Sequence, residues 1–217
     1  MRQYRCWIRT GFATSLYCFL MIAVFFAISM FSSGMDLYAA LRNIPYFPAL
    51  AGLMFTLLMI NSAYLTYLPV YLSFGSTRRS ARWGMQLMGI AIALGSTAIT
   101  ALTCLIPGEV SRSLLPMLPA LFFLQLMLAS VGHLVGCTTV RHPKWGTALN
   151  LLCVFLVCGG GGGIGGYLAG SGGALPALPV SLQPLTCTVA AAGIAAAITL
   201  LAVPLQSRVL KTYEVRL

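Results

Sequence analysis

No charged side chain occurs in residues 47–72, FPALAGLMFTLLMINSAYLTYLPVYL. About 20 mostly apolar residues in a helix cross the hydrocarbon layer of a bilayer, so this stretch is long enough to span a membrane. Five further apolar stretches lie on either side of it, at residues 14–31, 85–106, 115–135, 149–168 and 185–205. The sequence therefore predicts an all-α, polytopic integral membrane protein, in which residues 1–217 form a single transmembrane domain of six helices.

The composition supports the same class. Of the 217 residues, 59% are apolar and 7% are charged, whereas a soluble domain carries roughly a quarter charged residues. So few charges cannot cover a water-facing surface, and lipid must surround most of the chain. The net charge of +10 would suggest nucleic acid in a soluble protein, but here the basic residues lie in short segments between apolar runs. Nucleic acid is therefore not an expected partner.

The basic residues also predict the orientation. Eleven of the 13 lie in one alternating set of segments, and only Arg42 and Arg112 lie in the other set. The eleven are Arg2, Arg5, Arg9, Arg78, Arg79, Arg82, Arg141, Lys144, Arg208, Lys211 and Arg216. Because cytoplasmic segments are enriched in Lys and Arg, both termini are predicted to be cytoplasmic, with residues 206–217 as a short tail.

Residues 1–12 have an amphipathic pattern. Aromatic and apolar side chains recur at helical spacing, and arginines occupy another sector. The first set is Tyr4, Trp7, Ile8 and Phe12, and the second is Arg2, Arg5 and Arg9. Such a segment is predicted to lie in the membrane interface, with its rings toward lipid and its arginines toward anionic headgroups. The alternative is a basic flank that only fixes the orientation.

A glycine-rich run occupies the fifth predicted span. It comprises Gly159, Gly160, Gly161, Gly162, Gly163, Gly165 and Gly166. It lacks the Lys and Ser or Thr that follow the last glycine of a phosphate-binding P-loop. Two interpretations are open: close packing between helices, or a flexible or broken segment beside a cavity.

Groups that carry chemistry are scarce within the spans. No Asp, Glu, Lys or Arg lies in the middle of any predicted span, although intramembrane ionisable groups usually mark transport or catalytic sites. His133 and Cys137 share a helix face, but two ligands make a weak metal site, and structural roles are favoured. Asn61 and Gln125, with Asn150, are predicted to form hydrogen bonds between helices. No catalytic residue, metal site or bound cofactor is predicted, and the chain is not expected to be an enzyme.

The segment between the second and third predicted spans is the most informative. It reads YLSFGSTRRSARWG, residues 71–84. Gly75 is suited to end the second span, and Ser76 or Thr77 is suited to cap a new short helix. Three arginines would project from this helix, which would then be shaped to dock into a cytoplasmic protein. The alternative is a loop whose charges only set the orientation.

The octapeptide Leu72-Ser73-Phe74-Gly75-Ser76-Thr77-Arg78-Arg79 resembles a stretch found in ABC-2 type permeases, the six-helix membrane subunits of bacterial ATP-binding-cassette exporters. The resemblance implies a coupling helix at residues 75–83 that seats in the ATPase, an elbow helix at residues 2–12 and a short outer segment at residues 170–184. The implied docking residues are Phe74, Gly75, Ser76, Thr77, Arg78, Arg79 and Arg82. The chain departs from larger relatives in its short outer segments and its glycine-rich fifth span, which leaves the substrate open.

The resemblance also implies the partners and the location. A second copy or a sister permease subunit would complete the pathway, and cytoplasmic ATPase subunits would bind ATP and Mg²⁺. The complex would lie among the lipids of the bacterial inner membrane and would move an amphipathic, peptide or lipid-like substrate. The competing hypothesis is a membrane interaction, assembly or immunity protein that transports nothing, and an ATPase partner would separate the two.

Overall fold

A computed structural model of the chain describes residues 2–33, 44–75, 77–106, 109–170 and 184–212. Most of these residues are helical, and none of them forms a β-strand. The elements are α1 (Arg2–Ser33), α3 (Tyr46–Leu65), α4 (Tyr67–Ser73), α5 (Arg78–Thr103), α6 (Glu109–Leu114), the 3₁₀ helix η1 (Leu115–Met117), α7 (Leu118–Arg141), α8 (Pro143–Gly170) and α9 (Pro184–Thr212). A helix satisfies its own backbone hydrogen bonds, which apolar surroundings require.

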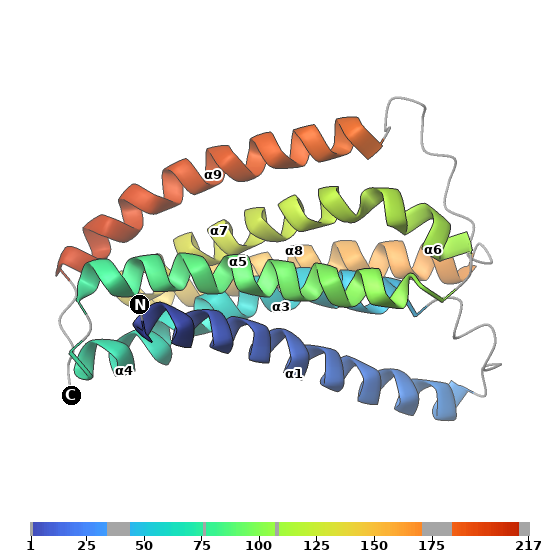
Figure 1. Cartoon of the computed structure of the whole chain (residues 1–217), viewed down its shortest axis with the longest axis horizontal. Coiled ribbons are helices and arrows are strands. Elements are labelled where there is room, and N and C mark those ends of the chain that lie inside the picture. Colours follow the sequence, from blue (N-terminus) through green and yellow to red (C-terminus); the bar gives the residue numbers. More distant parts are fainter. Residues whose placement is uncertain (1, 34–43, 76, 107–108, 171–183, 213–217) are drawn as a thin grey trace.

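The long helices run alongside one another in one bundle (Figure 1). At one end of the bundle α5 begins at Arg78, α7 ends at Arg141 and α9 ends beyond Lys211. The short helix α4 and the start of α1 lie at the same end (Figure 1). We call this the arginine end.

Among the described residues, four helical segments are long and apolar enough to cross a membrane: Phe47–Ser73, Arg78–Thr103, Leu115–Arg141 and Pro184–Lys211. They correspond to the second, third, fourth and sixth predicted spans, and they indicate a membrane-embedded, all-helical protein. The first and fifth predicted spans lie in α1 and α8. Many of the side chains there fall outside the description, so six membrane crossings remain a prediction.

Several helices extend beyond the predicted boundaries. α5 begins seven residues before the predicted span, and α9 continues through Thr212 into what was predicted to be a tail at residues 206–217. Hydropathy marks where side chains become polar, whereas the backbone stays helical until a residue or a cap interrupts it. Residues 213–217 lie outside the described part.

The second span is one apolar segment but two helices. α3 ends at Leu65 and α4 begins at Tyr67, with Thr66 between them. Pro69 follows within one turn and has no N–H to donate to the carbonyl of Leu65. The Thr66 hydroxyl donates a hydrogen bond to the Ser62 carbonyl oxygen at 2.8 Å, which gives this carbonyl a partner beside the break.

The central helix is α7, which packs against α3, α5, α8 and α9. Glycines on α7 allow α3 to approach closely, since small residues permit short distances between helices. A Cβ at Gly136 would overlap the Tyr64 ring, and one at Gly132 would lie 3.0 Å from the Leu57 carbonyl oxygen. Tyr64 and Leu57 are both almost completely buried.

We predict that Gly136→Ala destabilises the bundle by about 1–3 kcal/mol, because the added methyl group overpacks the α3–α7 contact. The matched control is Gly193→Ala on α9, where an added Cβ meets nothing within 4 Å. That change should leave stability unchanged or raise it by up to about 1 kcal/mol, since Ala favours helix over Gly. The measurement is the midpoint temperature of thermal unfolding in detergent, monitored by circular dichroism. An equal loss in both variants would contradict the assigned contact.

Candidate docking site at the arginine end

The connection between α4 and α5 is a tight corner. Gly75 has φ +81°, a backbone conformation that favours glycine. Thr77 has extended backbone, and its hydroxyl accepts a hydrogen bond from the Ser80 N–H at 3.2 Å, which caps α5. The predicted roles of Gly75 as a helix end and Thr77 as a cap are confirmed. Ser76 lies outside the described residues.

The helix that begins here is not short. The sequence predicted a separate coupling helix at residues 75–83, but α5 runs from Arg78 to Thr103 without interruption. Gly84, which was predicted to lie between helices, lies inside α5 and is buried. Its missing side chain leaves room for another element, because a Cβ there would overlap the Trp7 indole. The predicted coupling residues therefore form the first turns of α5.

The three arginines of this segment have different surroundings. Arg78 donates to the backbone carbonyl of Lys211 in the last turn of α9, so it caps a neighbouring helix at the end where cations are favourable. Arg79 is exposed. The Arg82 guanidinium lies 5.6 Å from the centroid of the Trp83 ring, within reach of a cation–π interaction. Arg78 thus has a partner within the chain, Arg79 is exposed, and Arg82 is half-buried beside Trp83.

Two large aromatic side chains flank these arginines at the surface. Phe74 is 83% exposed and Trp83 is 48% exposed. Together with Arg79 and Arg82 they form what we call the corner surface. The resemblance to ABC-2 type permeases implied a docking role for Phe74.

The N-terminal segment is part of this corner. Residues 2–12 are the beginning of the single helix α1 rather than a separate elbow helix. The Trp7 ring was predicted to face lipid, but it is 1% exposed and stacks on Tyr71 with ring centroids 4.1 Å apart. The sulfur of Cys6 also lies 2.8 Å from the Tyr71 hydroxyl.

The other side chains of the N-terminal pattern point in several directions. Ile8 is 37% exposed and Phe12 is 46% exposed. Arg5 and Arg9 are exposed and Tyr4 is half-buried. The described sector opposite Trp7 is therefore open to lipid or water, whereas the side chain of Arg2 lies outside the description. Lipid contact by this sector remains a prediction.

The glycine-rich run is helical, since α8 continues through it to Gly170. At Gly159 an added Cβ would meet nothing within 4 Å, so this glycine makes no close helix contact with the part of the chain that the structure describes. The packing around Gly160, Gly161, Gly162, Gly163, Gly165 and Gly166 lies outside the described side chains. The predicted outer segment also lies outside the description at residues 171–183.

Polar side chains link the helices in the interior. Gln125 on α7 donates to the Ser96 hydroxyl on α5 at 3.0 Å, which confirms its predicted role. Tyr64 and the Nδ1 atom of His133 lie within hydrogen-bond distance, 3.1 Å. Gln86 on α5 donates to Gln206 on α9 at 3.0 Å. Sequence reasoning missed both residues: Gln86 lies at the start of the third predicted span, and Gln206 directly follows the sixth.

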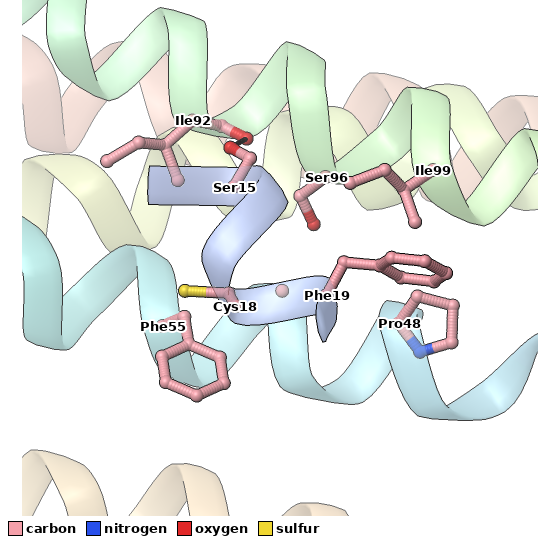
Figure 2. A pocket seen from close by; sticks show the side chains of 9 residues that line it. Ser15, Cys18, Phe19, Pro48, Phe55, Ile92, Ser96 and Ile99 are labelled. Carbon is pink, nitrogen blue, oxygen red and sulfur yellow. Dashed lines mark hydrogen bonds between the residues drawn. The ribbon is translucent and has the colours of Figure 1, made fainter. Parts of the chain in front are cut away.

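The interior provides no metal site in the part of the chain that the structure describes, where no three His, Cys, Asp or Glu side chains cluster. His133 and Cys137 are both buried in α7. A small cavity of about 20 Å³ lies between α1, α3 and α5, beside Ser15, Cys18 and Ser96 (Figure 2). Its volume is close to that of a single water site, so it is too small for a substrate.

No protein-family model, curated protein or solved structure matches this chain. The function proposed below therefore rests on the sequence and on this geometry.

We predict that Trp7→Ala destabilises the protein by about 3–5 kcal/mol, the usual cost of truncating a buried Trp. The matched control is Trp145→Ala, since Trp145 is 78% exposed and its removal should change stability by less than about 0.5 kcal/mol. Thermal unfolding of both variants in the same detergent provides the comparison. A Trp7→Ala protein as stable as the Trp145→Ala protein would show that Trp7 lies in the lipid interface after all.

Proposed function

We propose that this chain is the membrane-spanning permease subunit of an ATP-driven exporter. A separate cytoplasmic ATPase docks on the corner surface formed by Phe74, Arg79, Arg82 and Trp83. The cargo is an amphipathic, peptide or lipid-like molecule, and a second copy or a sister subunit completes the pathway. The observation that carries the proposal is the exposed basic and aromatic corner at the start of α5.

The arginines at this corner lower the stability of the start of α5 in the free chain. Arg78 and Arg79 occupy the first turn of α5, and no acidic residue accompanies them there. The N-terminal end of a helix carries partial positive charge, so each exposed cation there is unfavourable by about 0.3–1 kcal/mol. An acid-lined groove on a partner would offset this cost. Positive-inside orientation alone requires basic residues near the membrane but does not require exposed aromatic side chains beside them.

The exposed side chains are of the types that dominate binding energy. Trp and Arg are enriched among the residues that contribute most to protein interfaces. Phe74 is 83% exposed directly after the apolar segment Phe47–Ser73, and burying a large aromatic ring is favourable wherever the ring would otherwise face water. A partner groove that buries Phe74 and pairs Arg79 would gain from both effects.

The corner is connected to the interior by several helices. Through α4 it continues into α3, and through α5 it continues into a helix of 26 residues. Trp7 attaches α1 to Gly84 and Tyr71, and Arg78 attaches the end of α9. A displacement of the corner by an ATPase would therefore act on α1, α3, α5 and α9 together.

We predict that the double substitution Arg79→Glu and Arg82→Glu lowers ATPase recovery in a mild-detergent purification from the native host by tenfold or more. Reversal of charge pairs at an interface usually costs several kcal/mol. Arg78 is left intact because it caps α9. The measurement is mass spectrometry of the proteins that co-purify at stoichiometric amounts, together with transport-coupled ATP hydrolysis.

The matched control is Lys144→Glu, which reverses an exposed charge at the start of α8, also at the arginine end. This variant should keep the ATPase, and both variants should insert into the membrane at the wild-type level. If the wild-type chain recovers no ATPase under conditions that preserve other membrane complexes, the chain is instead a membrane assembly or immunity protein. If the double variant retains full recovery, docking occurs elsewhere.

A further inference from the structure

A larger cavity lies between α5, α7 and α9. Its volume is about 470 Å³, within the range of small-molecule sites, roughly 300–1,000 Å³. α7 contributes Phe123, Ser130 and His133, α5 contributes Gln86, and α9 contributes Ala196. α5 and α9 are close at the arginine end and separate farther along the bundle (Figure 1). The lining residues Ile90 and Leu200 are exposed on the outside of the bundle, so the cavity opens at its flank, within segments long and apolar enough to cross the membrane.

The lining is polar at one end and apolar at the other. Gln86 and His133 lie toward the arginine end, whereas Phe123, Leu126 and Ala192 lie toward the opposite end. Along α7, Phe123 and His133 are separated by about 15 Å at 1.5 Å per residue. A site with this gradient matches a molecule that has a polar head and an apolar chain. No Asp, Glu, Lys or Arg lines this cavity, so the head that fits is uncharged.

One buried polar atom at this end has no partner in the described part of the chain. His133 is 1% exposed, and its Nδ1 atom lies 3.1 Å from the Tyr64 hydroxyl. Its other nitrogen, Nε2, makes no hydrogen bond. It lies beside Gly89, another residue of the cavity lining. A buried nitrogen without a partner is costly in apolar surroundings.

The other polar groups of the cavity already have partners. The Ser130 and Thr199 hydroxyls lie 2.7 Å apart, and Gln86 donates to Gln206. Nε2 of His133 is the fully buried side-chain atom of this lining that has no hydrogen-bond partner among the described residues. An oxygen of a hydroxyl or carbonyl group, brought into the cavity, would supply its missing partner after a small movement of the lining.

We propose that the cavity between α5, α7 and α9 binds an uncharged amphiphile with a single acyl chain, whose hydroxyl or carbonyl oxygen pairs with His133. Binding itself is independent of the proposed ATPase. Only the role of the amphiphile as cargo rests on the proposed function. The apolar chain lies along Phe123 and Ala192, and the head lies toward the arginine end.

The test uses the purified chain in lipid nanodiscs and a monoacylglycerol that carries a photoreactive diazirine on its acyl chain. After illumination, mass spectrometry maps the labelled peptides, which should come from the lining of α5, α7 and α9. Ala196→Trp fills the cavity and should reduce this labelling tenfold or more. The matched control is Ile194→Trp, since Ile194 is 51% exposed on α9 and does not line the cavity.

The head group is tested separately with His133→Leu. Labelling by the monoacylglycerol should fall about fivefold, the usual effect of one lost hydrogen bond. Labelling by a diazirine-bearing alkane, which has no head, should stay unchanged in the same variant. A parallel loss with both probes would mean that His133 only supports the packing, and it would overturn its assignment to the head.

Three results would overturn the proposal. Labelling spread evenly over lipid-facing helices would show ordinary lipid contact, and full labelling of Ala196→Trp would show that the cavity is not the site. Third, disulfide cross-linking of Ala196→Cys between two chains would show that a second copy occupies the cavity.

If Ala196→Trp does not purify as a single species, Ala192→Trp serves as the cavity-filling variant. If the cavity is labelled but no ATPase co-purifies with the chain, the binding site stands and only the proposed exporter function is overturned.

Discussion

The contact of Tyr64 with α7 determines how the helices of this bundle assemble. Lipid chains are as apolar as leucine, so burying apolar side chains between helices supplies little driving force in a membrane. Close packing and hydrogen bonds must supply it instead. The Tyr64 ring lies where a side chain at Gly136 would be, and its hydroxyl reaches His133 one turn away. One side chain on α3 thus provides both kinds of contact to the helix that also holds α5, α8 and α9.

The attachment of α9 differs from that of α3. Two polar links join α9 to α5 at the arginine end: Arg78 donates to the Lys211 carbonyl, and Gln86 donates to Gln206. Beyond these links α5 and α9 separate, and the cavity lies between them with α7 as its floor. α9 packs mainly against α7, where the Ser130 and Thr199 hydroxyls lie 2.7 Å apart. The two links to α5 hold the two helices together at the arginine end only.

Sequence patterns predicted the helices, the glycine at the corner and the Thr77 cap, because these depend on residues close together in the chain. They could not predict where α5 begins, since hydropathy does not register a helix that continues through Arg78 and Arg82. Sequence patterns also could not predict which residues surround Trp7. Helical spacing identifies a ring face, but only the fold brings Gly84 and Tyr71 beneath that face. The Gln86–Gln206 link joins residues 120 positions apart, and neither residue stands out in its local sequence.

The corner surface and the cavity lie on the same helix, which gives the proposed exporter a direct route between them. Arg79 and Gln86 are about two turns apart on α5, and no proline interrupts this helix. The Trp7 ring packs against Gly84 between them, so a partner that moves Arg79 would move the start of α5 and the start of α1 together. Gln86 lines the cavity and is bonded to α9. A shift at the corner would therefore reach both walls of the cavity without passing through any charged group in the membrane.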